Sequence, residues 1–307
     1  MQEGAEKGPV GWARALALLF IAAVSWVGNP GILVAAPFAL LVFFIPPRRA
    51  LTVTLAAVGL GLVLVGGPSS GFWYLERGWA FLVGGCFLAL SLRWPEGGFL
   101  PRGLGAVFGA YLGMGLFLGV RPGEWGVVDW LVKSRLEFTV STFMRAMGPD
   151  VFPEAFELQA LEIVALQGFI FPALLGLASL SGLGLAWWLF VRLDRRNASG
   201  IGPLKDFRFN DQLVWVLIIG IISLVLSSGI VARLGVNAVV FMGALYALRG
   251  AAVVLFLTGG LSLFGGFLFV IGFVLLAPFV VLGAMVIGLG DTWFDLRKRG
   301  VLSRPEA

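Results

Sequence analysis

The sequence predicts an all-α protein, a polytopic transmembrane helical bundle of about eight to ten membrane segments with one amphipathic interfacial helix. Hydrophobic residues make up 59% of the 307 residues, and charged residues only 13%. Long apolar runs, separated by short polar stretches, recur along the whole chain. A soluble domain of this size could not cover so much apolar surface. We therefore expect residues 1–307 to form a single integral membrane domain in contact with the lipid bilayer.

Five apolar runs occupy the first half of the chain. The first follows a nearly neutral start and has no small-x-small cleavage site, so we interpret it as a retained span. Asn29-Pro30 separates it from the second run, which ends at the Pro46-Pro47 pair. Runs this short must extend into flanking residues or rely on neighbours, because about 20 residues span a bilayer. The expected runs are 11–27, 31–45, 51–65, 79–92 and 103–120.

Residues 126–147 predict an amphipathic helix, because apolar residues recur there at spacings of three and four. The apolar stripe is Val128, Val132, Leu136, Val140, Phe143 and Met147, and the polar side is Asp129, Lys133, Glu137, Ser141 and Arg145. The stripe is too narrow to span a bilayer, so we expect a structural helix on the outer interface, within an outward-facing segment at 121–158. A lid over an outward-facing cavity is the alternative.

The second half carries four further apolar runs, at 161–191, 213–231, 237–258 and 261–290. Basic residues near the run ends place the loop at 192–212 in the cytoplasm, together with both termini of a multi-pass inner-membrane protein. Nine simple crossings would put the C-terminus outside. We therefore expect the last run to consist of two short segments bent near Ala277-Pro278. Merging an earlier pair of runs into one crossing would also return the C-terminus to the cytoplasm.

Arg249 lies well inside an apolar run, where a charge is costly. Helical spacing places Met242, Gly243, Tyr246, Arg249, Gly250 and Val253 on one face. One hypothesis is that Arg249 snorkels toward the cytoplasm. The other is an anion-binding or gating role in the bundle interior, with Tyr246 beside it. The candidate polar partners are Asp291, Glu162, Gln159 and Gln167.

The remaining polar positions lie at the ends of the apolar runs. Asn237 stands where a run begins, and we expect it to be a helix N-cap. Glu162 and Gln167 lie near the outer end of a span, where they mark the interface or line the mouth of a pocket. The terminal "GDTWFDLRKR" predicts that Trp293 lies at the membrane interface. It also predicts a basic cluster in the headgroup zone, formed by Arg297, Lys298 and Arg299. We expect Asp295 to pair with Lys298 or Arg299.

The composition argues against several kinds of chemistry. The sequence has no histidine and one cysteine, Cys86, and it lacks a Walker-type glycine loop. No concentrated acid/base or metal-ligand constellation appears, so we expect neither enzymatic activity nor a metal or cofactor. The net charge of +5 comes from basic residues at run ends, so we expect no nucleic-acid partner.

The C-terminal half resembles the YybS-like family of predicted bacterial integral membrane proteins, a domain-of-unknown-function family. The resemblance covers about 160–300 and rests on "FIFPALLGLASLSGLGLAWWLFVRLDRR", "PLKDFRFNDQLVWVLIIG", Asn237, "YALRG" at 246–250 and "GLGDTWFDLRKR". Where this chain has Arg249, the family pattern has glutamine, so no role is carried over to that position. The family is similar in turn to the substrate-binding S components of energy-coupling-factor transporters.

This resemblance implies a substrate-binding subunit of a small-molecule transporter, working with separate ATPase and coupling subunits. S components dock through an Ala-x-x-x-Ala face of the first helix, which Ala13 and Ala17 match. Apart from the resemblance, we expect substrate to enter from outside under the 126–147 helix and to contact Glu162, Gln167, Tyr246 or Arg249. The alternative is a non-transporting scaffold or assembly subunit of another membrane complex. The sequence names neither a substrate nor a partner.

Overall fold

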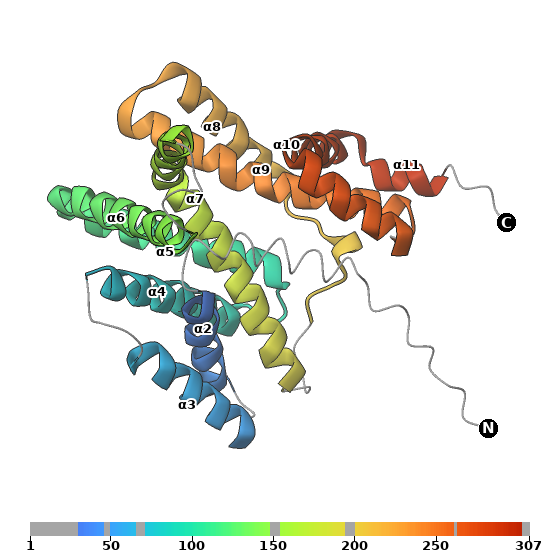
Figure 1. Ribbon diagram of the computed structural model, residues 1–307. Helices are drawn as coiled ribbons and strands as arrows, with labels where there is room; N and C mark the ends of the chain where they lie inside the picture. The colour runs from blue at the N-terminus through green and yellow to red at the C-terminus, as the bar shows by residue number, and fades with distance from the viewer. Residues whose placement is uncertain are drawn as a thin grey trace. The chain divides into compact units, whose positions relative to one another are not determined.

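The computed structural model describes residues 30–45, 50–65, 71–147, 154–193, 200–260 and 263–302. All regular secondary structure in these ranges is helical, without strands, and the predicted all-α class is confirmed (Figure 1). The described residues belong to two compact units, an N-terminal unit within Val24–Ile201 and a C-terminal unit built mainly from Gly202–Ala307. Whether the chain is a single domain, as predicted, stays a prediction.

Five helical segments are long and apolar enough to cross a membrane: Trp73–Arg93, Phe99–Val120, Val164–Leu193, Gly229–Leu257 and Leu276–Phe294. Shorter apolar helices cover Gly31–Phe44, Ala50–Gly61 and Asp211–Leu226. These lengths and compositions are those of a polytopic membrane protein, because such helices satisfy every backbone polar group internally. The prediction of a membrane protein is therefore supported at this level.

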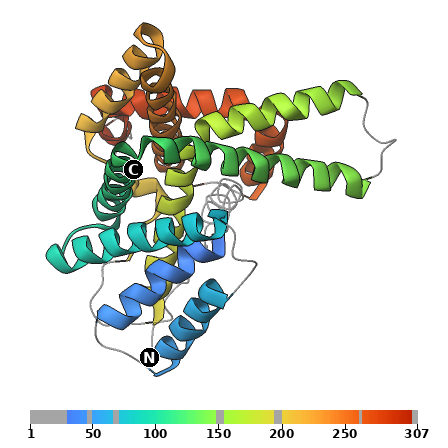
Figure 2. The ribbon, with the colours of Figure 1, turned by 90° about the vertical axis from the view of Figure 1, so that its left-hand side faces the viewer.

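The N-terminal unit contains six described helices. They are α2 (Pro30–Phe44), α3 (Ala50–Val65), α4 (Gly71–Arg93), α5 (Phe99–Val120), α6 (Pro122–Met147) and α7 (Glu154–Leu193). Helix α2 packs against α3, α4 and α7, and α4 packs against α5. The beginning of α7 runs beside α6 as a hairpin (Figure 2).

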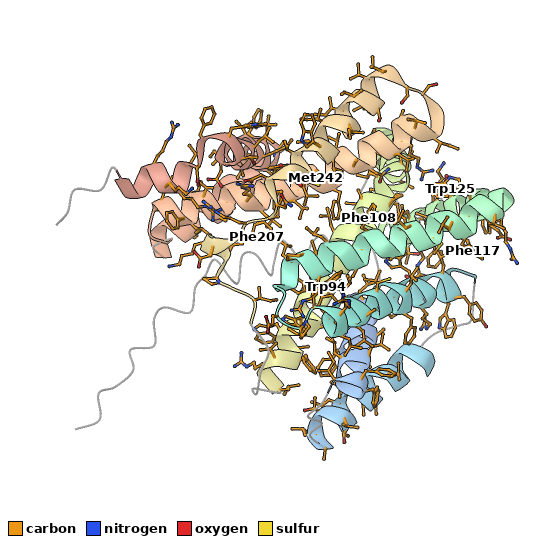
Figure 3. All side chains as sticks on the ribbon, turned by 180° about the vertical axis from the view of Figure 1, so that it is seen from behind. Trp94, Phe108, Phe117, Trp125, Phe207 and Met242 are labelled. Carbon is orange, nitrogen blue, oxygen red and sulfur yellow. The ribbon has the colours of Figure 1, made fainter. Side chains whose placement is uncertain are left out.

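Aromatic and hydroxyl contacts hold the N-terminal unit together. Trp79 of α4 donates an indole hydrogen bond of 2.8 Å to the hydroxyl of Ser179 in α7, and both residues are buried. Tyr111 of α5 donates to the carbonyl of Pro172, inside α7. Phe87 and Trp187 pack edge to face, with ring centroids 5.8 Å apart. Phe108 and Phe117 instead lie exposed on α5, as expected for side chains that face lipid (Figure 3).

A helix over the predicted range 126–147 is confirmed as α6, which extends it to Pro122–Met147. Val132 of the predicted stripe is buried, and Lys133 and Glu137 of the polar side are exposed. Trp130 and Phe138 expose 66% and 60% of their surfaces, which the predicted single stripe did not anticipate. The position of α6 at the outer interface stays a prediction.

The start of α4 corrects the sequence analysis. The expected run began at residue 79, but the helix begins at Gly71 and includes Glu76 and Arg77. Arg77 can be accommodated because its guanidinium stacks 3.8 Å from the ring centre of Trp73 and also donates to the Trp73 carbonyl. An aromatic partner one helical turn away thus allows the helix to carry a charge that hydropathy alone would place in a loop.

The C-terminal unit contains α8 (Val214–Leu226), α9 (Gly229–Leu257), α10 (Leu263–Phe294) and α11 (Leu296–Leu302). Two short 3-10 turns, η1 (Leu204–Asp206) and η2 (Asp211–Leu213), precede α8. Helix α9 packs against α8, α10, α11 and η1. The predicted bend of the last run is confirmed, since Leu276 leaves helical geometry just before Pro278 (φ −127°, ψ 28°).

Candidate functional site

The face of α9 predicted around Arg249 points into the C-terminal unit. Met242, Tyr246, Arg249 and Val253 are each at most 3% exposed. Helix α10 can approach this face closely because glycines meet there. A Cβ atom on Gly250 would collide with the carbonyl of Ala284, and one on Gly288 with the carbonyl of Tyr246. The glycine pair thus brings the second half of α10 against Arg249.

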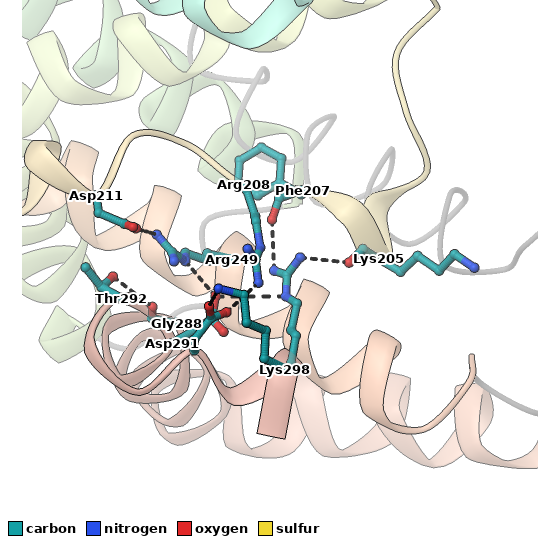
Figure 4. Close-up of polar contacts among 11 residues, drawn as sticks. Lys205, Phe207, Arg208, Asp211, Arg249, Gly288, Asp291, Thr292 and Lys298 are labelled. Carbon is teal, nitrogen blue, oxygen red and sulfur yellow. Dashed lines mark hydrogen bonds and ion pairs between the residues drawn. The ribbon is translucent and has the colours of Figure 1, made fainter. Parts of the chain in front are cut away.

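Arg249 is paired on two sides (Figure 4). Its Nε donates to Asp291 Oδ2 of α10 at 3.0 Å, and its Nη1 donates to Asp211 Oδ1 of η2 at 2.5 Å. The hypothesis of a snorkelling arginine is therefore wrong, because only 3% of the side chain is exposed and two carboxylates satisfy it. Of the predicted partners, Asp291 is confirmed.

The two carboxylates differ sharply in their access to solvent. The Asp291 side chain is fully buried, whereas the Asp211 side chain is 60% exposed. Asp211 follows Asn210, whose side chain accepts from the amide of Gln212 and so caps the 3-10 turn. In the sequence, Asp211 looks like an ordinary acidic residue in the first turn of a helix. Nothing local indicates that the loop before α8 folds onto α9.

Arg297 of α11 forms the second cation of the cluster. Its Nη1 and Nη2 donate to the carbonyls of Lys205 and Phe207 at 3.0 and 2.9 Å, and its Nε lies 3.9 Å from Asp291 Oδ2. The prediction that Arg297 lies among headgroups is wrong, since it is 4% exposed. Burial lowers its pKa, and the nearby Asp291 opposes that shift. Arg297 thereby ties the loop before α8 to the end of α10.

Aromatic rings complete the surroundings of Arg249. The Phe209 ring centre lies 5.4 Å from the guanidinium carbon and 5.1 Å from the centre of the Tyr246 ring. A cation over an aromatic face is stabilised by the ring quadrupole, more so where water is excluded. Phe209 therefore covers the ion pair on the side that the loop approaches.

The cluster has spare hydrogen-bonding capacity in its interior. Asp291 Oδ1 and Arg297 Nε have no hydrogen-bond partner among the described residues. The Tyr246 hydroxyl lies toward Thr292, without a hydrogen bond of normal geometry. Buried polar atoms are normally satisfied, so each of these retains the capacity for a further hydrogen bond. The formal charges of Arg249, Arg297, Asp211 and Asp291 sum to zero.

A second ion-pair group lies at the surface beside the cluster. Asp295 accepts from Arg208 at 2.9 Å and pairs with Lys298 at 2.5 Å, which confirms the predicted pairing with Lys298. Lys298, and then Arg208, lower the pKa of the Asp295 carboxyl below its ordinary value. Asp295 also has a positive φ of 45°, at the break between α10 and α11.

Asn237 is not a helix N-cap. Helix α9 begins at Gly229, so Asn237 lies inside it, where its side-chain amide donates to the Arg233 carbonyl at 2.9 Å. The chain breaks earlier, at the extended residues Ser227 and Ser228, and Gly229 takes a positive φ of 62° there. Glycine adopts that conformation without steric cost, which explains the position of the break.

Of the other predicted site residues, Glu162 and Gln167 belong to the N-terminal unit, whereas the Arg249 cluster belongs to the C-terminal unit. Gln167 is half-buried on α7 of the N-terminal unit. Glu162 also belongs to α7, but its side chain lies outside the described part of the chain. Ala13 and Ala17 lie outside the described residues altogether. Among the predicted ligand-binding residues, the structure therefore brings Tyr246 and Arg249 together.

Within the described residues, no group of three or more His, Cys, Asp and Glu side chains is arranged to hold a metal ion. Comparison of the chain with protein-family models, curated proteins and solved structures finds no match. The resemblance to the YybS-like family accordingly stays a prediction, and the functional argument rests on the geometry of the Arg249 cluster.

Proposed function

We propose that this protein is the membrane-embedded, substrate-binding subunit of a small-molecule transporter. The observation that carries the proposal is the burial of Arg249 inside α9, a helix apolar enough to cross a membrane. Charged residues in such helices are costly, and they usually face the protein interior and mark substrate or ion pathways. The Asp211 side chain is 60% exposed, so a ligand would reach Arg249 from the side of the loop before α8 rather than under the 126–147 helix.

The energy for transport would come from separate subunits. The sequence contains no Walker-type glycine loop, so an ATPase and a coupling subunit are the expected partners. The Arg249 cluster offers two guanidinium groups, one buried carboxylate and aromatic cover, which suits a small polar molecule rather than a purely apolar one. We propose no catalytic role for this cluster.

Purification from the native membrane in mild detergent, followed by mass spectrometry of everything that stays bound, tests the proposal. We expect a stoichiometric small molecule, or an ATPase with a coupling subunit. An Arg249→Lys variant should lose most of the small molecule, because lysine cannot donate to two separated carboxylates with guanidinium geometry. Arg93→Lys, at an exposed position on α4, should retain it.

An unrelated membrane complex, with neither a small molecule nor energising subunits, would contradict the proposal. That result would favour the alternative of a scaffold or assembly subunit. Loss of the small molecule in the Arg93→Lys control as well would show that its retention reports general folding rather than the Arg249 cluster.

A further inference from the structure

We infer that Asp211 is an exchangeable counter-ion of Arg249, and that the ligand of this site is a small monoanion whose carboxylate takes the place of Asp211. The inference rests on the proposed binding function and names its substrate class. It begins from the unequal anchoring of the two carboxylates that hold Arg249.

Asp291 is the fixed partner. Its side chain is fully buried, and it lies between Arg249 Nε at 3.0 Å and Arg297 Nε at 3.9 Å. Its helix is held against α9 by the close crossing at Gly250 and Gly288. Removing Asp291 from this position would leave two buried guanidinium groups without their shared anion, which is a large cost.

Asp211 is the replaceable partner. Its side chain is 60% exposed, and it lies on a three-residue 3-10 turn rather than on a long helix. When Asp211 turns outward, its carboxylate regains water at little cost. The Nη1 of Arg249 then faces the opening that Asp211 occupied, while Phe209 still covers the guanidinium.

Charge counting sets the charge of the ligand. Without Asp211, the formal charges of Arg249, Arg297 and Asp291 sum to +1. A single negative charge restores neutrality, whereas a neutral molecule leaves a buried positive charge and a dianion leaves an excess negative one. A carboxylate has the oxygen geometry that Asp211 already presents to Arg249, and guanidinium groups bind carboxylates with charge-assisted hydrogen bonds.

Acetate is the simplest probe of this site, used with full-length protein in phosphatidylcholine nanodiscs at ionic strength held constant with sodium chloride. In the wild-type chain Asp211 competes with acetate, so binding is weak. In Asp211→Asn the competing charge is gone, and we expect acetate to bind on the order of 10-fold more tightly, because the site is no longer occupied by the protein itself. Calorimetry or the acetate dependence of thermal stability measures the change.

Two variants provide matched controls. Glu96→Gln removes one negative charge at an exposed position of the N-terminal unit rather than from the unit that holds Arg249 and Arg297, and it should leave acetate binding as in wild type. Asp211→Glu keeps a carboxylate at the position and should show no gain. If Asp211→Asn does not fold, Asp211→Ser replaces it, and we expect the same tighter binding of acetate. Equal acetate binding by Asp211→Asn, Asp211→Ser and Glu96→Gln overturns the inference.

Three further outcomes complete the test, and the first and the last of them separate this inference from the proposed function. If the native ligand found by mass spectrometry is neutral or cationic, the inference fails while a binding function stands. If acetate binding to Asp211→Asn is abolished when phosphatidylglycerol replaces part of the phosphatidylcholine, a lipid phosphate is the occupant and a small soluble carboxylate is not. If acetate binds as expected but no ligand or energising partner co-purifies, the inference stands and the transport proposal fails.

Discussion

Arg249 shows how a costly residue is made tolerable by its neighbours. An isolated guanidinium in an apolar helix bundle has a large desolvation cost, which only good geometry and opposite charge can offset. Here Asp291 approaches from α10 and Asp211 from the loop before α8, and the ring of Phe209 covers the guanidinium. The three partners come from sequence positions 38 to 42 residues away, so the ion pair depends on tertiary structure.

Removing the charge of Arg249 should strongly destabilise the C-terminal unit. Arg249→Leu leaves the fully buried Asp291 without its closest cation, and breaking a buried pair costs about 3–5 kcal/mol. We expect a large fall in apparent Tm in detergent and poor expression. Arg93→Leu at an exposed position is the control and should change the Tm little. A Tm for Arg249→Leu equal to that of the control would contradict the buried ion pair.

The surface group at Asp295 predicts a pH dependence. Its pKa is lowered from the ordinary 3.8, chiefly by Lys298 and also by Arg208. The ionised carboxylate therefore stabilises the fold above the unfolded pKa, and this contribution is lost as the pH falls through the lower folded value. The apparent Tm of wild type, measured from neutral pH to about pH 3, should fall more steeply than that of Asp295→Asn.

Asparagine suits this test because it tolerates the positive φ of Asp295 while removing the charge. Glu96→Gln, in an exposed loop, serves as the control and should keep the wild-type slope. Identical pH profiles for wild type and Asp295→Asn would show that the Arg208 and Lys298 contacts do not stabilise the protein.

At the scale of elements, the crossing of α9 and α10 depends on glycine. A Cβ atom on Gly288 would enter the space of the Tyr246 backbone, whereas one on Gly283, in the same helix, meets nothing within 4 Å. Gly288→Ala should therefore force the helices apart and cost about 1–3 kcal/mol, while Gly283→Ala should be neutral or stabilising by up to about 1 kcal/mol. Thermal unfolding of both variants in detergent measures the difference.

Gly288→Ala should also disturb the Arg249 cluster, because separating α10 from α9 moves Asp291 away from Arg249. A Gly288→Ala protein that is as stable as Gly283→Ala would contradict the close crossing.

Helix α10 illustrates a second local rule. Pro278 lacks a backbone N–H, and the nonhelical dihedrals of Leu276 lie two residues before it, as expected where a proline interrupts a helix.

At the scale of the whole molecule, the predicted topology can be tested by labelling. In a background of Cys86→Ser, a single cysteine at Lys205 should be protected from a membrane-impermeant maleimide in intact cells, because the loop before α8 is predicted to be cytoplasmic. A cysteine at Glu124, which is exposed near the start of α6, should be labelled. Both positions should react after permeabilisation. Labelling of both or neither in intact cells would contradict the predicted orientation.

Much of the helix content could be predicted from hydropathy alone. The amphipathic period of 126–147 and the bend near Pro278 are both local signals, and the structure contains α6 and the break at Leu276. Helix ends were less predictable. The break before α9 lies at Ser227 and Ser228 rather than near Asn237, because these residues are extended and Gly229, at the start of α9, takes a positive φ.

The sequence by itself determined that this is an all-α protein with membrane-spanning helices, because composition and apolar run length depend only on the order of residues. It also marked Arg249 and Tyr246 as a shared face and named Asp291 as a candidate partner. Only the tertiary structure decided that Asp211 and Arg297 complete the cluster. Their pairing requires a loop and a terminal helix to fold back onto α9, and such long-range contacts leave no periodic trace in the sequence.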